Sequence, residues 1–76
     1  MKLHMENNVC TMRVFLTKGT DDEHLLVTIE TNIIPQIGSI FMYEDDWKIY
    51  NVSNVAYFYN PTTKTCSVDV TVKEQV

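Results

Sequence analysis

The chain has 76 residues and a formal net charge of −4, and 45% of its residues are hydrophobic and 21% charged. That size and composition predict one small globular domain over residues 1–76 and exclude a disordered chain. The acidic balance counts against nucleic acid as a partner, because affinity for nucleic acid comes largely from cations that neutralise phosphates.

The N-terminal residues 1–8 show no periodic pattern, and we expect a frayed segment there. They contain no apolar stretch like the centre of a secretory signal peptide. No run in the chain approaches the roughly 18 apolar residues of a membrane span. On these grounds we expect a cytoplasmic protein without a membrane partner.

The first half of the chain predicts two strands joined by a turn. Residues 9–17 alternate apolar and polar side chains, as a half-buried strand does, and the inward residues are Cys10, Met12, Val14 and Leu16. A turn at 18–23 contains Gly19, which supplies a permissive backbone. Residues 24–30 return, so the two runs are predicted to form a β-hairpin whose second strand points inward with Leu25, Val27 and Ile29.

The middle of the chain predicts a connection and two further strands. Pro35 cannot donate a hydrogen bond to a central ladder, so residues 31–38 are predicted to form a connection or an edge. Residues 39–43 form a short strand that turns at the acidic triplet 44–46. In the long run 47–59 the apolar spacing drifts from two residues to three, which indicates a β-bulge or a sharp coil within that strand.

A turn at 60–64 precedes the last predicted strand, 66–72, which has the most regular alternation in the sequence. Five short strands in so short a chain predict an all-β fold, a small five-stranded, partly open barrel, because closing a sheet removes exposed edges. We predict SH3-like topology because no helix is apparent, with an OB-like barrel as the alternative.

The two cysteines fall on the inward faces of the first and last strands, Cys10 beside Met12 and Cys66 beside Val68. A buried cysteine behaves as a small apolar side chain, so we expect two reduced thiols in the core. A disulfide is the alternative, and it requires neighbouring strands and an oxidising compartment.

No constellation of catalytic or metal-binding residues is apparent in the sequence. A nucleophile needs a base within reach, and the two histidines, His4 and His24, stand near the N-terminus and beside an acidic turn. The cysteines lack the close spacing of a structural zinc site. The acidic triplets 21–23 and 44–46 fit solvated turns, and a divalent cation that bridges them is the alternative. We predict no enzyme, no cofactor and no metal.

Aromatic residues concentrate in the long fourth strand, where Tyr57, Phe58 and Tyr59 are consecutive. One interpretation places Phe58 in the core while the two tyrosines cover the outside. The other makes Tyr57 and Tyr59, with Tyr50 and Tyr43, an exposed aromatic patch. Tyrosines are enriched at interfaces, and they also stack on planar bases.

In residues 34–56, a turn with Pro35, Gly38 and Ser39 precedes a short apolar strand, an acidic turn and an aromatic residue, Trp47, that opens the next strand. This segment, about a third of the chain, resembles a pattern in small SH3-like β-barrel proteins of bacteria and their phages. Ser39 stands where that pattern frequently has Asp. The resemblance implies a binding module or inhibitor and offers no catalytic residues.

These observations favour a non-enzymatic binding protein that acts as a homo-oligomer, in a phage or mobile element that counters a host defence. It would sequester a small nucleotide-like ligand or occlude a host protein through its aromatic surface. For a nucleotide, Tyr57 or Tyr59 would stack on the base, and phosphate would meet Arg13 with Lys48 or Lys64. The alternatives are an acidic OB-like or SH3-like nucleic-acid-binding module and a small structural component of a phage particle.

Overall fold

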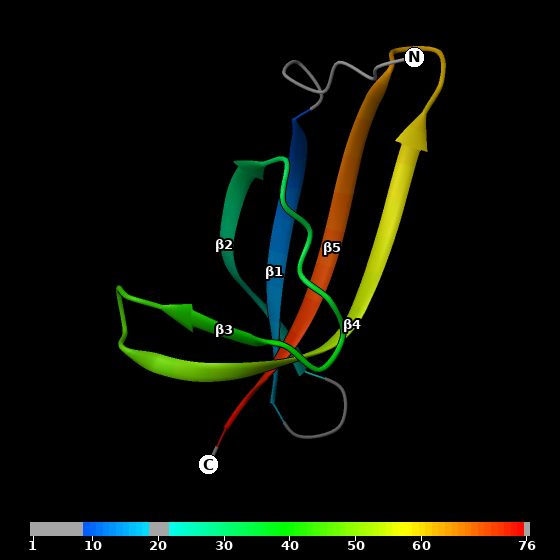
Figure 1. Ribbon diagram of the computed structural model, residues 1–76. Helices are drawn as coiled ribbons and strands as arrows, with labels where there is room; N and C mark the ends of the chain where they lie inside the picture. The colour runs from blue at the N-terminus through cyan, green and yellow to red at the C-terminus, as the bar shows by residue number, and fades with distance from the viewer. Residues whose placement is uncertain (1–8, 19–21, 76) are drawn as a thin grey trace.

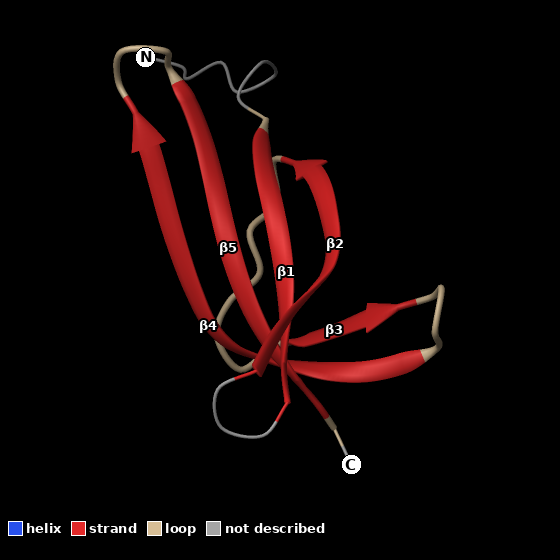
Figure 2. Cartoon of the chain, turned by 180° about the vertical axis from the view of Figure 1, so that it is seen from behind, coloured by secondary structure: helices blue, strands red, loops and turns tan. Residues whose placement is uncertain are grey.

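The computed structural model describes residues 9–18 and 22–75, and every regular element within them is a β-strand (Figures 1 and 2). The predicted all-β fold with five strands is thereby confirmed, while the expected frayed segment 1–8 lies outside the described residues. The strands, in chain order, are β1 (Cys10–Lys18), β2 (Asp22–Thr31), β3 (Ile40–Tyr43), β4 (Lys48–Asn60) and β5 (Thr65–Glu74).

One sheet contains all five strands in the order β2-β1-β5-β4-β3, and it curls into a half-barrel (Figure 1). Neighbouring strands are antiparallel except β1 and β5, which are parallel. The two edge strands, β2 and β3, lie on the same side of the molecule in both views and are not neighbours in the sheet. The partly open barrel predicted from the sequence is therefore confirmed, with β5 at its centre.

The core lies on the concave face of the sheet. In the parallel β1–β5 pair Met12 lies beside Val68 and Val14 beside Val70, so the apolar residues of both strands reach the same face. Full burial of a valine-sized side chain contributes roughly 1.5–3 kcal/mol, which makes this central part the main source of stability. The buried side chains are Cys10, Met12, Val14, Leu16, Tyr50, Val52, Val68, Val70 and Val72.

The predicted β-bulge in the long strand is confirmed and lies at Ser53. The register of β4 against β5 shifts there, between Val52 and Asn54. Before the bulge Tyr50 and Val52 point into the core, and after it Val55 packs against the same core. One extra residue thus lets β4 keep its apolar side chains inward while it bends around the barrel.

A second register shift, in the β1–β2 pair, corrects one detail of the sequence interpretation. Val27 pairs with β1 in the regular register, but Leu25 pairs with Phe15, which leaves Leu26 as the extra residue. The predicted inward position of Leu25 is wrong, since with Phe15 it lies on the convex face and 55% of its surface is exposed. Val27 and Ile29 pack against the core as predicted.

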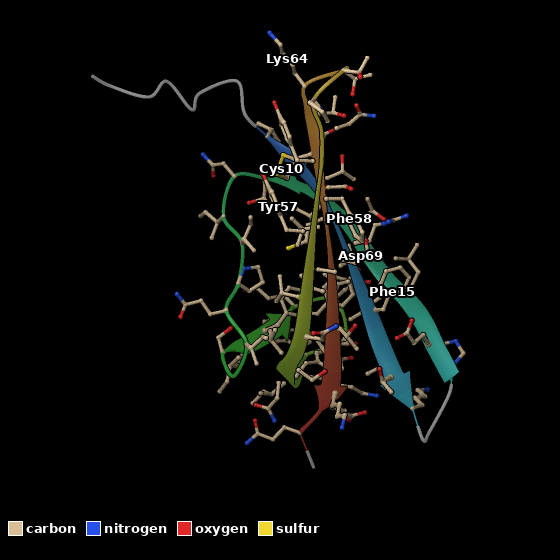
Figure 3. All side chains as sticks on the ribbon, turned by 90° about the vertical axis from the view of Figure 1, so that its right-hand side faces the viewer. Cys10, Phe15, Tyr57, Phe58, Lys64 and Asp69 are labelled. Carbon is tan, nitrogen blue, oxygen red and sulfur yellow. A yellow bond between two sulfur atoms is a disulfide. The ribbon has the colours of Figure 1, made fainter. Side chains whose placement is uncertain are left out.

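The connection between β2 and β3, residues 32–39, crosses the concave side of the sheet, the side on which Cys10 and Tyr57 lie (Figures 1 and 3). Near the end of the connection stands Gly38, whose φ of 93° lies in the left-handed region that favours glycine. The Gly38 N–H donates to the carbonyl of Val52 at 2.8 Å, which anchors the connection to β4. The prediction of a connection at this place is confirmed.

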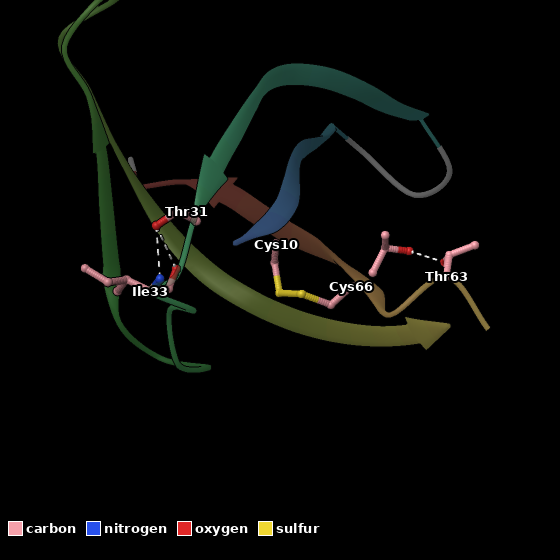
Figure 4. Close-up of a disulfide and its surroundings, with 6 residues drawn as sticks. Cys10, Thr31, Ile33, Thr63 and Cys66 are labelled. Atoms are coloured by element: carbon pink, nitrogen blue, oxygen red, sulfur yellow. Dashed lines mark hydrogen bonds between the residues drawn. A yellow bond between two sulfur atoms is a disulfide. The ribbon is translucent and has the colours of Figure 1, made fainter. Parts of the chain in front are cut away.

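A disulfide joins Cys10 to Cys66, so the expectation of two reduced thiols is wrong (Figure 4). Each cysteine stands one position before the Thr11–Ser67 pair of the parallel register, and their Cα atoms are 4.9 Å apart. The two residues are 56 positions apart in sequence. Closing a loop of that length contributes about 4 kcal/mol by restricting the unfolded chain. The expectation failed because strand order, which local patterns do not contain, decides which cysteines meet.

Candidate functional site

Three consecutive aromatic side chains, Tyr57, Phe58 and Tyr59, stand exposed near the end of β4. We call this part of the β4–β5 hairpin, with its turn 61–64, the aromatic end. β3 pairs with β4 only as far as Asn51, so in the described part of the chain no strand covers the outer edge of β4 here. Each ring keeps more than half of its surface exposed, 56% for both tyrosines and 51% for Phe58.

The aromatic end presents rings on both faces of the sheet. Tyr59 lies opposite Cys66, and Tyr57 shares its face, so the tyrosines occupy the concave side. Phe58 lies opposite Ser67 on the convex side, and Figure 3 shows Tyr57 and Phe58 on opposite sides of the sheet. The interpretation that placed Phe58 in the core is wrong, while the two exposed tyrosines agree with the other interpretation.

Hydrogen bonds of Asn60 and the backbone of residues 61–64 shape the turn at the aromatic end. The carboxamide oxygen of Asn60 accepts hydrogen bonds from the backbone N–H groups of Thr62 at 2.9 Å and Thr63 at 3.3 Å. Pro61 fixes one backbone angle of this turn, and Lys64 completes it with a left-handed φ of 57°. Lys64 therefore lies at the tip of the hairpin (Figure 3).

The aromatic end carries a hollow of about 410 Å³, mostly on its convex side, and no charged side chain of the described residues lines it. Thr11, Ser67 and Phe58 form one row along it, since Ser67 pairs with both of the others, and Asn60 with Thr65 forms a second. Tyr59 and Cys66 complete the lining. Hydroxyl and carboxamide groups beside a phenyl ring suit a neutral planar molecule with polar groups. The sequence interpretation missed this hollow because Thr11 and Ser67 meet only through the parallel β1–β5 pair.

Arg13 lies on the convex face, and the structure does not bring it together with the tyrosines. Its Nε donates to Oδ1 of Asp69 at 2.8 Å, and the guanidinium carbon lies 5.9 Å from the ring centroid of Phe15. Asp69 offsets its charge, and Phe15 covers one side of the guanidinium. The predicted joint action of Arg13 with Tyr57 or Tyr59 on one ligand is therefore not supported, because the groups face opposite ways.

The two lysines predicted to meet phosphate lie at different ends of the sheet. Lys48 opens β4, at the end opposite the aromatic rings, and its Nζ lies 3.8 Å from Oε2 of Glu74. Lys64 lies at the hairpin tip, at the same end as Tyr57 and Tyr59 (Figure 3). Of the three predicted cations, only Lys64 is placed at the aromatic end.

Tyr50 and Tyr43 belong to the interior of the β3–β4 hairpin, so the prediction that they join the exposed patch is wrong. Only 1% of Tyr50 is exposed, and its hydroxyl donates to Oδ2 of Asp46 at 2.5 Å. Tyr43 is half-buried and stacks on Phe41 with 6.4 Å between the ring centroids. These rings pack against the core that β1, β4 and β5 build.

The contact between Tyr50 and Asp46 shifts both titrations. Burial raises the pKa of Tyr50 to about 12, and the hydrogen bond to Asp46 adds to the rise. The same hydrogen bond lowers the pKa of the Asp46 carboxyl from its ordinary value. At neutral pH the phenol is protonated and the carboxylate is charged, so the pair ties the acidic turn 44–46 to β4 and does not supply a reactive group.

Within residues 9–18 and 22–75 no group of three or more His, Cys, Asp or Glu side chains is placed to hold a metal ion. The triplet 44–46 forms the turn between β3 and β4, whereas the triplet 21–23 begins outside the described residues.

No helix in the described part of the chain is long and apolar enough to cross a membrane. No protein-family model, curated protein or solved structure matches the chain. The candidate site is thus defined by its own geometry.

Proposed function

We propose that the protein is a non-enzymatic binding protein that contacts its partner through the aromatic end. The observation that carries this proposal is the exposure of three consecutive rings, Tyr57, Phe58 and Tyr59, at one strand end. Aromatic side chains offer a large contact area with few rotatable bonds, and tyrosine is among the residues that most often dominate binding energy.

A protein partner is better supported than a phosphate-bearing ligand. Arg13 is engaged by Asp69 on the convex face, Lys48 lies at the far end of β4, and only Lys64 stands near the tyrosines. A single lysine neutralises only one of the several negative charges of a nucleotide or a nucleic acid. An aromatic protein interface with a polar rim needs no cation. The setting expected from the sequence, a homo-oligomeric phage or mobile-element protein that occludes a host protein, is part of this proposal.

The hollow on the convex side supports a second candidate, the binding of a small neutral ligand. Its volume of about 410 Å³ is within the range of small-molecule sites. Phe58 offers a ring for stacking, and the hydroxyls of Thr11 and Ser67 offer hydrogen bonds from the same row. A nucleobase or a nucleoside without phosphate has the matching chemistry.

The two candidates share Tyr59, which lines the hollow, and they differ in Tyr57 and Phe58, so variants of these rings separate them. Tyr57→Ala/Tyr59→Ala removes the concave rings, and Phe58→Ala removes the convex one. Tagged protein is purified from cells that naturally make it, and native mass spectrometry reports copurifying proteins and retained small molecules. We expect a protein partner that is lost only from the tyrosine variant, with at least a tenfold lower affinity in a direct titration. A retained small molecule that is lost from Phe58→Ala would favour the hollow instead, whether or not the tyrosine variant also loses it.

The controls separate binding from folding. Both variants should melt within a few degrees of the wild type, because all three rings are more than half exposed. Tyr57→Phe/Tyr59→Phe keeps the rings and should retain most of the affinity. If Tyr57→Ala/Tyr59→Ala unfolds, or if it binds every partner as the wild type does, the aromatic end is not the binding surface.

A further inference from the structure

A second exposed apolar surface lies on the β3–β4 hairpin, away from the aromatic end. Met42 pairs with Ile49 across the hairpin, and Ile40 lies two residues from Met42 on the same face. Trp47 stands in the adjoining turn. Between 39% and 73% of each of these four side chains is exposed, and we call them the β3–β4 apolar face.

The hairpin exposes this face because the side chains of its other face pack against the core. Phe41 and Tyr43 alternate with Ile40 and Met42 along β3, and they pack against the core with Tyr50. The alternation of a strand then leaves the remaining side chains no position but the convex face. Pairing with β4 fixes which side chains of β3 face outward, since the register of β3 against β4 is regular over all four residues of β3.

The turn of the hairpin exposes Trp47 at the end of this face. The sequence predicted that Trp47 opens the strand, but β4 begins at Lys48. Trp47 instead has a left-handed φ of 57°, and its N–H donates to the carbonyl of Tyr43 at 2.9 Å. This geometry turns the chain back into β4 and leaves 73% of the surface of Trp47 exposed.

The exposed apolar area is large for so small a chain. With about 200 Å² for a fully exposed large side chain, the β3–β4 apolar face exposes on the order of 500 Å². The largest apolar patch on a soluble monomer is typically about 300–600 Å², and it is often functional. Two copies that cover this face with each other bury about 1,000 Å² in total, which is the area at which specific interfaces begin.

The surroundings of this face suit another copy of an acidic chain. Asn51, opposite Ile40, pairs with Lys73, and the backbone N–H of Gln75 donates to the carbonyl of Ile49 at 2.9 Å. The convex row of Ile40 is therefore continued by an amide and a lysine, whereas the acidic turn 44–46 borders the face at its other end, beside Trp47. A two-fold axis perpendicular to the strands sets the Lys73 end of one copy against the acidic turn of the other, so that unlike charges meet.

We infer that a second copy of this chain packs on the β3–β4 apolar face, with the two hairpins stacked face to face about a two-fold axis. Such an interface uses the same patch on both copies, and stacked sheets lie about 10 Å apart with their side chains between them. The inference rests on the homo-oligomer in the proposed function and gives it a surface. It does not depend on which partner the aromatic end binds.

Sedimentation equilibrium between about 5 and 200 µM tests the inference on the full chain. The wild type should sediment at about twice 8.8 kDa. Met42→Lys puts a charge at the centre of the face and should raise the dimer dissociation constant at least about 100-fold, giving a monomer. The matched control is Leu25→Lys, which makes the same chemical change at a similarly exposed convex position on β2 and should remain a dimer.

Further outcomes are decisive either way. A wild-type mass of 8.8 kDa over the whole range overturns the inference, and so does a Met42→Lys variant that stays dimeric. Circular dichroism checks that the monomeric variant is folded, and Ile40→Lys replaces it if it is not. Tyr57→Ala/Tyr59→Ala should stay dimeric even where it loses its partner, so failure of the partner proposal is seen separately. Dissociation of that variant alone would move the dimer contact to the aromatic end and overturn the inference.

Discussion

Tyr50 and Tyr57 show how one residue type takes two roles on the same face of one strand. Both point to the concave side of β4, yet Tyr50 is buried and Tyr57 is more than half exposed. The difference comes from β3, which pairs with β4 beside Tyr50 and stops well before Tyr57. The sequence predicted exposed tyrosines correctly at 57 and 59 and wrongly at 50, because an alternating pattern does not reveal where a neighbouring strand ends.

The raised pKa of Tyr50 predicts a loss of stability at alkaline pH. Its pKa is about 12 in the folded protein and about 10 in the unfolded chain. Neutral Tyr50 therefore contributes stability that is complete below about pH 10 and is lost as pH rises towards 12. Tyr50→Phe cannot ionise, so between pH 9.5 and 11.5 its melting temperature should fall by about 9 °C less than that of the wild type.

Thermal unfolding followed by circular dichroism across that pH range checks this prediction. Tyr50→Phe should also melt below the wild type at pH 7, because it loses the hydrogen bond to Asp46. Tyr59→Phe, at an exposed position, is the control and should keep the wild-type alkaline slope. An equal slope in Tyr50→Phe and the wild type would contradict the assignment.

Two bulges show which irregularities of a strand the sequence reveals. The bulge at Ser53 was predictable, because isolated apolar residues on either side of it change their spacing. The bulge at Leu26 was not, because Leu25, Leu26 and Val27 are consecutive and any of them fits an inward position. Pairing with β1 decides the matter by placing Leu25 beside Phe15 on the convex face. The five strands themselves were predicted to within a few residues of their observed ends.

Deletion of Ser53 should lower stability without changing which side chains of β4 point inward. Without the extra residue Val52 and Val55 stand two positions apart and both stay on the concave face, but β4 loses the bulge that bends it around the barrel. We expect a cooperative unfolding transition in circular dichroism at a melting temperature clearly below that of the wild type. Ser53→Ala keeps the residue and loses only the hydrogen bond to the carbonyl of Thr71 at 3.1 Å, so it should melt within a few degrees of the wild type. A deletion variant that melts like Ser53→Ala would show that the bulge is dispensable.

Contacts between β1 and β5, which are neighbours at the centre of the sheet, hold the whole molecule together. Parallel pairing of β1 with β5 creates the centre of the core, the row beside the convex hollow and the disulfide. None of these was predictable from the sequence, because periodicity indicates that a strand exists and which face it buries, but not which strand lies beside it. The same limit applies to the candidate site. Tyr57 and Tyr59 lie on one strand, so their shared face was predictable, whereas the partner of Arg13 depends on which strand lies beside β1.

Removal of the disulfide should lower stability without changing the fold. Cys10→Ala/Cys66→Ala frees a loop of 56 positions, so the free energy of unfolding should fall by about 4 kcal/mol, or about 20 °C in melting temperature. A reducing agent should lower the melting temperature of the wild type and leave the double variant unchanged. Equal sensitivity of the two proteins to reductant would show that the disulfide does not form in solution.

The central place of β5 bears on how the chain is made. Of the five strands of the sheet, β5 is the last to be translated, yet it lies between β1 and β4. A nascent chain therefore holds two separate hairpins, each with one apolar side in water, until the strand that joins them is translated. A premature stop before Thr65 removes the middle of the sheet, so such a product should be degraded, whereas loss of an edge strand would leave the centre in place.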